Sequence, residues 1–202
     1  YYDINLKKAR QKLLRENYNY HDYVGLIQDA KLLNKICSHH KPNIIIHLAA
    51  QAGVRYSIKN PISYVESNLL GTFYILEIAK KYKPDHLLMA STSSVYGSAK
   101  DYPFYENQKC DTPMSFYAAT KLSNEAMAHS YSHLYDIPIT MFRFFTVYGP
   151  WGRPDMALFK FTQNIALDKP IDVYNNGNML RDFTYIDDLV KAIFLLMSKI
   201  PK

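Results

Sequence analysis

The sequence has few of the features that would place a protein outside the cytosol. Its 202 residues contain only two cysteines, Cys37 and Cys110, which are too few for a disulfide framework. Nor do these cysteines have the spacing of metal ligands, so no metal site is expected. No apolar run approaches the ~18 residues that a membrane span needs, and the first residues lack the apolar core of a signal peptide. We therefore expect a cytoplasmic protein with no membrane partner.

Blocks of like charge are also missing. The formal net charge is +6, but the basic residues are scattered along the chain. No repeat combines basic and aromatic residues, so nucleic acid is not an expected partner. A modest positive charge suits an anionic small substrate equally well. With 48% hydrophobic and 21% charged residues, the chain has the composition of a globular domain.

Apolar runs alternate with helical segments along most of the chain. Runs of strand length occupy residues 44–50, 85–90 and 139–144, and continuous apolar runs are typical of parallel strands that are covered on both faces. Helices are expected at residues 7–15, 30–40, 61–82 and 115–135, with Asp29 as the cap of the second and Pro61 in the first turn of the third. This order predicts an α/β fold with a doubly wound, Rossmann-like parallel sheet.

The pattern changes after Pro150, where a smaller subdomain is expected to begin. In this region we expect a helix at 155–167, a strand at 171–174, a turn at 175–177 and a helix at 187–199. Near the N-terminus, a short strand and turn are expected at 20–25. The expected domains are therefore residues 1–150 and residues 151–202. Ligands of parallel sheets lie beyond the carboxyl ends of the strands, which makes residues 49–57, 91–97 and 146–154 the candidate functional loops.

Tyr117 and Lys121 form a candidate catalytic pair. A spacing of four on a helix puts the phenol and the ammonium on one face, one turn apart. A tyrosine normally keeps its proton until about pH 10, and a neighbouring cation favours the phenolate, which can then transfer protons near neutral pH. The chain has 18 tyrosines, however, so this spacing also arises by chance. The alternative is that both side chains are ordinary surface residues.

Four consecutive hydroxyl residues, Ser91 to Ser94, follow the expected strand at 85–90. Together with Tyr117 and Lys121, they resemble the Ser/Thr–Tyr–Lys catalytic set of short-chain dehydrogenases/reductases. Residues 47–57, Asn68-x-x-Gly71-Thr72, residues 143–156 and residues 181–188 are similar to the extended branch of this family, which modifies nucleotide sugars. Within that branch, Tyr1-Tyr-Asp, residues 6–10 and residues 148–157 most resemble UDP-glucuronate 4-epimerases.

The resemblance implies an NAD-dependent isomerase that epimerises a UDP-uronic acid at C4 through a 4-keto intermediate, in polysaccharide biosynthesis. It implies that Tyr117 is the base, that Lys121 lowers the Tyr117 pKa and contacts the nicotinamide ribose, and that Thr92 relays the proton. The cofactor residues that it implies are Ile27, Leu48, Ala49, Ala50, Gln51, Asn68, Tyr117, Lys121 and Phe144. The residues that it implies for binding the UDP-sugar are Ser93, Ser94, Thr146, Arg153, Arg181 and Arg55. A homodimer through the helices at 61–82 and 115–135 is also implied.

Several of these residues have plainer alternatives. Arg181 could pair with Asp182 or Asp188 on the surface rather than bind a diphosphate. Asn68 could be an ordinary helix-interior asparagine, and Arg55 could contact protein rather than phosphate. We interpret His47, inside an apolar strand, as a hydrogen-bonded core residue and not as a ligand.

Two departures from the family pattern stand out. The first strand and the Gly-x-x-Gly-x-x-Gly turn that hold the NAD diphosphate are not among these 202 residues, so we expect an interior segment of a longer protein that holds NAD poorly by itself. Leu26-Ile27 also stands where relatives have Asp-Ile, which removes a carboxylate contact to adenine. The packing of Ile27 is expected to persist.

Three other functions remain open at this stage. The sugar could be another UDP-sugar, or the reaction could be that of a 4,6-dehydratase or a uronate decarboxylase. Dehydratases resembling this family carry Asp-Glu after the catalytic threonine, whereas here Ser93-Ser94 follow Thr92, which argues against dehydration. The segment could also be a non-catalytic remnant that binds nucleotide sugars.

Overall fold

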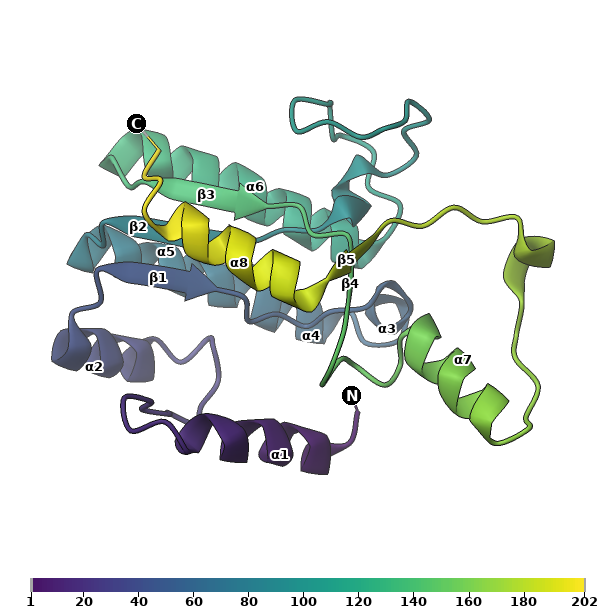
Figure 1. The fold of residues 1–202 in the computed structure, drawn as a ribbon. Coiled ribbons are helices and arrows are strands. Elements are labelled where there is room, and N and C mark those ends of the chain that lie inside the picture. The colour runs from purple at the N-terminus through teal and green to yellow at the C-terminus, as the bar shows by residue number, and fades with distance from the viewer. Residues whose placement is uncertain (1, 202) are drawn as a thin grey trace. The chain divides into compact units, whose positions relative to one another are not determined.

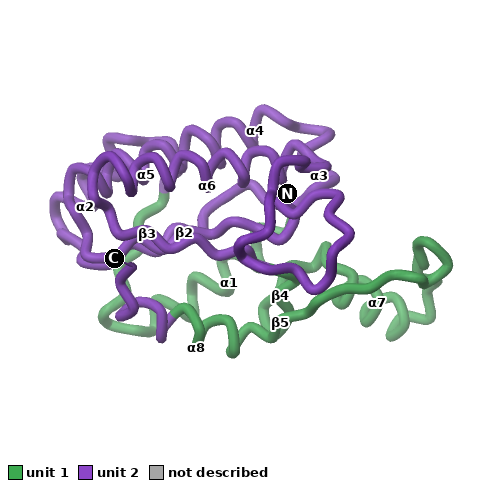
Figure 2. Tube along the Cα trace, turned by 90° about the horizontal axis from the view of Figure 1, so that it is seen from above, with its two compact units in different colours: residues 1–24, 145–193 green, residues 25–144, 194–202 purple. Residues whose placement is uncertain are grey.

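The computed structural model describes residues 2–201, so Tyr1 of the Tyr1-Tyr-Asp motif lies outside the described part. The chain divides into two compact units, and each combines segments that are far apart in the sequence (Figure 2). Unit 1 contains residues 1–24 and 145–193, and unit 2 contains residues 25–144 and 194–202. The predicted domain boundary at residue 150 stays a prediction.

Unit 2 is built on a three-stranded parallel sheet (Figure 1). The strands β1 (Ile44–His47), β2 (His86–Ala90) and β3 (Ile139–Phe142) pair in the order β1-β2-β3. Residue 44 pairs with residue 86, and residue 87 pairs with residue 139. Each of the three apolar runs therefore forms the predicted strand, and the parallel sheet of the predicted fold class is confirmed.

The helices of unit 2 match the prediction closely. They are α2 (Ala30–His40), α3 (Val54–Lys59), α4 (Ile62–Tyr64), α5 (Gly71–Tyr82) and α6 (Phe116–Tyr135), together with a π-helix at Val65–Leu70 and a 3₁₀-helix at Ser93–Tyr96. Asp29 caps α2 by accepting a hydrogen bond from the Leu32 amide at 3.0 Å. The predicted helix 61–82 is interrupted by the π-helix, a geometry that is often found at functional sites.

The core of unit 2 lies between β2 and the helices α5 and α6. Its buried members come from all three elements and from the turn before β3: Ile75, Leu76, Ala79, Leu87, Met89, Ala128 and Ile137. Gly71 allows α5 to approach the segment before α2, because a Cβ at residue 71 would lie 2.6 Å from Ile27 Cγ2. Ile27 packs against this core.

Unit 1 contains α1 (Ile4–Arg15), β4 (Thr146–Tyr148), α7 (Ala157–Ala166), a 3₁₀-turn at Tyr174–Gly177 and β5 (Phe183–Tyr185), and α8 (Ile186–Met197) begins in it. The strands β4 and β5 are parallel, with Thr146 opposite Phe183. Within residues 2–201, no helix is both long and apolar enough to cross a bilayer.

Two predicted strands are wrong, and one strand pair was not predicted. Residues 20–25 form a loop, because Asp22 bonds to Gln11 and Arg15 of α1 instead of joining a sheet. Residues 171–174 also lie outside any strand and lead into a turn in which Asn175 and Asn176 have left-handed backbone angles. The pair β4–β5 has only three residues per strand, which is too short for a clear apolar alternation.

Candidate active site

Thr92 lies at the carboxyl end of β2, at the start of the 3₁₀-helix Ser93–Tyr96. Its hydroxyl accepts a hydrogen bond from the Ser94 amide at 3.2 Å and caps that short helix. The Ser93 amide donates to the Phe144 carbonyl at 2.8 Å, which continues the pairing of β2 and β3 beyond the strands. Thr92 is 8% exposed, whereas Ser93 and Ser94 are half-buried. The loop therefore presents its hydroxyls at the sheet edge where ligands of parallel sheets bind.

Tyr117 and Lys121 occupy the first two turns of α6, as predicted. Ser115 caps this helix by accepting from the Ala118 amide at 3.1 Å. Lys121 is only 3% exposed, and its Nζ donates to the Ala90 carbonyl at 2.7 Å. Burial lowers the pKa of Lys121 to about 8. The Tyr117 ring contacts the Tyr64 ring edge-to-face, with centroids 6.0 Å apart. Lys121 is thus buried in unit 2, and Tyr117 is half-buried.

Asn68 connects the π-helix to two other segments of unit 2. Its Oδ1 accepts from the Gln51 amide at 2.8 Å, and its Nδ2 donates to the Gln51 carbonyl at 3.1 Å and to Thr120 Oγ1 at 3.1 Å. Thr120 Oγ1 in turn donates to the Tyr117 carbonyl at 2.8 Å. Asn68 is fully buried. It therefore fixes the loop after β1 against the turn that carries Tyr117, which is more than an ordinary helix-interior asparagine does.

A carboxylate one turn beyond Lys121 makes a second connection between α6 and the threonine loop. The Ser91 hydroxyl donates to Glu125 Oε1, and Arg143 donates to both Glu125 oxygens, with Nη2 to Oε2 at 2.8 Å. The Glu125 and Arg143 side chains are 15% and 21% exposed. The Glu125 carboxylate holds the pKa of Arg143 above its usual range. Sequence reasoning missed this group, although position 125 lies one helical turn from Lys121.

His47 behaves as the core residue that the sequence predicted. It is 5% exposed, and its Nε2 shares a hydrogen bond with Thr72 Oγ1 at 3.1 Å. Burial, and then the charge of Lys121, lower the pKa of His47 to about 4. A neutral imidazole at physiological pH avoids a second buried positive charge near Lys121.

The predicted cofactor residues after β1 lie at the carboxyl end of that strand. Leu48 and Ala49 follow this strand and are exposed, and Ala50 and Gln51 are half-buried. Exposed apolar side chains at such a strand end suit the rings and ribose of a cofactor. Lys121 lies on α6, which connects β2 to β3. Phe144 stacks on Phe142 with ring centroids 5.2 Å apart. Arg55 is exposed on α3.

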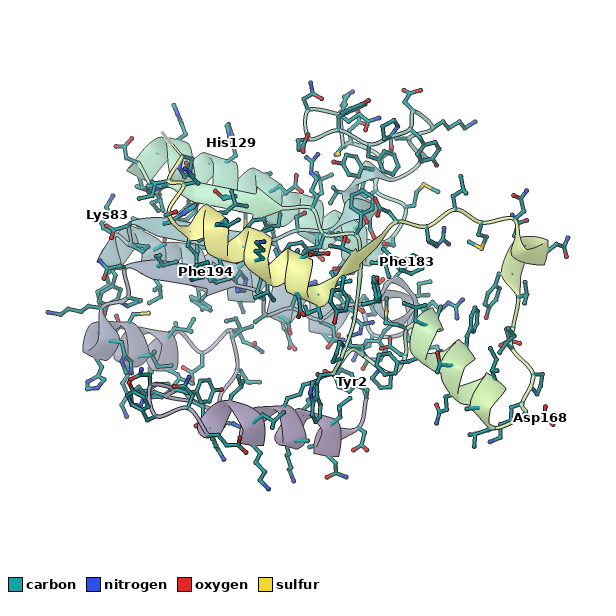
Figure 3. The ribbon with its side chains drawn as sticks, viewed as in Figure 1. Tyr2, Lys83, His129, Asp168, Phe183 and Phe194 are labelled. Atoms are coloured by element: carbon teal, nitrogen blue, oxygen red, sulfur yellow. The ribbon has the colours of Figure 1, made fainter. Side chains whose placement is uncertain are left out.

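Unit 1 brings three of the predicted substrate residues around one pocket of about 150 Å³. Thr146 comes from β4, Arg153 from the loop after it, and Arg181 from the segment before β5. Phe183, labelled in Figure 3, and Phe159 are among the apolar walls. The β4–β5 pairing explains why residues 146 and 181 meet despite their separation in the sequence. A pocket lined by apolar side chains and two arginines suits an anionic ligand with a ring.

The two arginines of this pocket are held differently. Arg153 donates to Asp155 from Nε at 3.0 Å and from Nη2 at 2.8 Å. Arg181 is exposed and donates to the Leu180 carbonyl at 2.8 Å. In the described residues it forms no ion pair with Asp182 or Asp188, so the alternative of a surface ion pair has no support. Arg181 lines the pocket.

Comparison with known proteins agrees with this arrangement. Residues 5–202 match the sequence profile of the NAD dependent epimerase/dehydratase family. The chain belongs to that family.

Relatives within the family include a probable UDP-glucuronate 4-epimerase of Rhizobium meliloti, which is 54% identical over all of this chain and 59% of its own length. The UDP-glucuronate 4-epimerase 1 of Arabidopsis thaliana is 51% identical over 95% of this chain and 46% of its own length. The chain thus spans roughly half to three fifths of the length of these curated relatives.

Among solved structures, the UDP-glucuronic acid 4-epimerase from Bacillus cereus, in complex with UDP-glucuronic acid and NAD, matches 96% of this chain and 60% of its own chain. The TM-score is 0.90 and the identity is 36%. This similarity confirms the Rossmann-like fold class that was predicted from the sequence of this chain.

Proposed function

We propose that the full-length protein is an NAD-dependent UDP-uronate 4-epimerase, which interconverts UDP-glucuronate and UDP-galacturonate through a 4-keto sugar. The observation that carries this proposal is the joint presence of Thr92, Tyr117 and buried Lys121 on one packed scaffold. The relatives named UDP-glucuronate 4-epimerases support the substrate.

The proton transfer is assigned to Tyr117. As a phenolate it takes the proton from the 4-hydroxyl, and Lys121 makes this possible because a nearby ammonium favours the charged phenolate. Thr92, at the carboxyl end of β2, is assigned the hydrogen bond to the same sugar oxygen. NAD, when bound, would supply the acceptor and then the donor of the C4 hydride.

Lys121 is assigned a second task at the cofactor. A buried ammonium that already donates to the Ala90 carbonyl has two further protons to donate, and a ribose hydroxyl is a suitable acceptor. Asn68 supports the proposed cofactor-binding surface by fixing the backbone of Gln51. Ile27, Leu48, Ala49, Ala50 and Phe144 complete the proposed cofactor surface.

The anionic parts of the substrate are assigned to the cationic pocket of unit 1. Arg181 is the candidate for the diphosphate, because a guanidinium offers a forked, charged contact to phosphate oxygens. Arg153 and Thr146 are the candidates for the uronate carboxylate, and Ser93 and Ser94 remain candidates for the sugar by the family resemblance. A firm grip on the carboxylate would keep the β-keto acid intermediate away from the geometry for loss of CO2.

The test uses the protein expressed from its complete reading frame. Incubated with UDP-glucuronate and no added reductant, it is expected to form UDP-galacturonate without CO2. The variant Tyr117→Phe is expected to lose about 10³-fold or more of this rate, because the proton acceptor is gone. CO2 or a stable keto sugar would instead indicate a decarboxylase or a dehydratase, and turnover of another UDP-sugar would change the substrate. No turnover and no bound NAD would support a non-catalytic nucleotide-sugar-binding protein.

We also infer a cytoplasmic homodimer. The helices α4, α5 and α6 carry exposed apolar side chains, with Ile62 59% and Phe116 40% exposed, which a second copy could cover. A sedimentation-velocity run that gives only a monomer at micromolar concentration would contradict the dimer.

A further inference from the structure

Two segments that the sequence set apart as typical of UDP-glucuronate 4-epimerases are joined by one side chain. Arg10 ends the segment 6–10, and Trp151 and Gly152 lie within the segment 148–157. Arg10 Nη2 donates to the carbonyl of Trp151 and to that of Gly152, the latter at 3.2 Å. All three residues belong to unit 1. The two segments are therefore one structural feature, although 141 residues separate Arg10 from Trp151.

Tyr2 holds the Arg10 guanidinium from the other side. Its hydroxyl accepts from Arg10 Nη1 at 2.7 Å, and its ring centroid lies 5.5 Å from Arg10 Cζ. Tyr2 precedes α1 and is labelled in Figure 3. Arg10 is thus fixed in one orientation, with its planar fork directed at two successive carbonyls.

The turn that Arg10 holds has an unfavourable backbone. Trp151 has φ 62° and Gly149 has φ 141°, and a left-handed conformation costs a non-glycine residue about 1–2 kcal/mol. A Cβ at residue 152 would lie 2.7 Å from the ring of Phe159 and 3.1 Å from the Gly149 carbonyl oxygen. Strained backbone persists only where the surroundings hold it, and it gathers at ligand sites.

Not every donor of Arg10 is satisfied. Its Nε is buried and has no hydrogen-bond partner among the described residues, and a buried donor without an acceptor destabilises the folded protein. The residue after the turn is Arg153, which lines the pocket together with Gly152. The Arg153 backbone follows directly on the turn that Arg10 holds, while its guanidinium donates to Asp155.

We propose that Arg10 is a positioning residue for substrate specificity, which holds the 149–152 turn so that Arg153 can receive a carboxylate on the sugar. This inference rests on the proposed function for the carboxylate itself. Lysine cannot replace Arg10 fully, because an ammonium lacks the planar fork that spans two carbonyls.

The first measurement is the binding of UDP-glucuronate and of UDP-glucose, which lacks the carboxylate, to the full-length protein by calorimetry. Arg10→Ala is expected to reduce the preference for UDP-glucuronate by about 10-fold or more, the worth of one charge-assisted hydrogen bond, and to leave UDP-glucose affinity unchanged. Arg10→Lys is expected to fall between Arg10→Ala and the wild type and covers the case in which Arg10→Ala does not fold. Arg15→Ala is the matched control, because Arg15 lies on the same helix and pairs with Asp22 instead.

The second measurement is amide hydrogen exchange in the peptide that covers residues 149–156. Exchange is expected to rise in Arg10→Ala and not in Arg15→Ala. Unchanged exchange would overturn the inference, and so would an equal loss of affinity for both sugars. If the wild type binds UDP-glucose as well as UDP-glucuronate, the proposed substrate is wrong, while the exchange result still decides whether Arg10 holds the turn.

Discussion

The charged side chains of the candidate sites are more buried in unit 2 than in unit 1. In unit 2, Lys121 is 3% exposed and tied to a backbone carbonyl, and Glu125 is enclosed by Ser91 and Arg143. In unit 1, the Arg153 and Asp155 side chains are 29% and 32% exposed, and Arg181 lies in the open. Proton transfer needs groups whose environment shifts their pKa, and a charge such as that of Lys121 acts more strongly on a neighbour when it is shielded from water. Residues that bind an anion need no such shift and can stay hydrated until the ligand arrives.

The strongest test of this contrast replaces Lys121 by methionine in the full-length protein. The variant Lys121→Met keeps the length of the side chain but removes the ammonium that favours the Tyr117 phenolate. The rate of epimerisation is expected to fall by about 10²-fold or more, whereas the folded protein is retained. A variant with more than a tenth of the wild-type rate would show that this ammonium does not assist the base.

The same variant also isolates the contribution of Lys121 to the pH dependence of the free energy of unfolding. Burial lowers the Lys121 pKa from 10.5 to about 8, so between these pH values the unfolded chain binds more protons than the folded one. The free energy of unfolding of the wild type, relative to Lys121→Met, should therefore rise as the pH increases above about 8, by at most about 3 kcal/mol. Urea unfolding of both proteins at pH 7.5, 8.5 and 9.5 measures this difference. A difference that stays constant would show that the ammonium is not buried in the full-length protein.

Much of unit 2 could be predicted because its signals are long and local. The three apolar runs, Asp29 before α2 and the uninterrupted helix after Ser115 each predicted an element that the structure contains. Thr92, Tyr117 and Lys121 were found from the resemblance to a family whose motif they match. The strand pair β4–β5 and the loop at residues 20–25 depend on partners far away in the sequence, and no local pattern shows these partners.

The supporting residues of the candidate site were the part that sequence reasoning missed. In the sequence, nothing distinguishes Glu125 from other charged residues of a helix. Only the fold places Ser91 and Arg143 beside it. Asp155 was read as the start of a helix, whereas its carboxylate binds Arg153 ahead of α7. Such side chains are chosen by tertiary contacts and carry no periodic signal of their own.

A smaller effect is expected from the carboxylate of unit 2. Glu125→Ala removes the acceptor of Ser91 and leaves the partly buried guanidinium of Arg143 without its partner, so the free energy of unfolding should fall by about 2–3 kcal/mol. Glu77→Ala on α5 is the comparison. Glu77 pairs with Lys80, with both side chains about 40% exposed, and accepts a hydrogen bond from the Tyr131 hydroxyl at 2.7 Å, so its loss should cost only about 1 kcal/mol. Equal losses in urea unfolding would show that Glu125 is no better enclosed than Glu77.

The smallest effect is expected at the ion pair of unit 1. Asp155→Asn keeps the shape of the side chain but removes the charge that faces Arg153. Because both side chains are about a third exposed, water replaces most of the lost attraction, and the free energy of unfolding should change by less than about 1 kcal/mol, and by still less at high salt. Urea unfolding at low and high ionic strength checks this. A loss comparable to that of Glu125→Ala would contradict the contrast between the units, because the substrate arginine would then be locked as firmly as the groups that surround the proposed base.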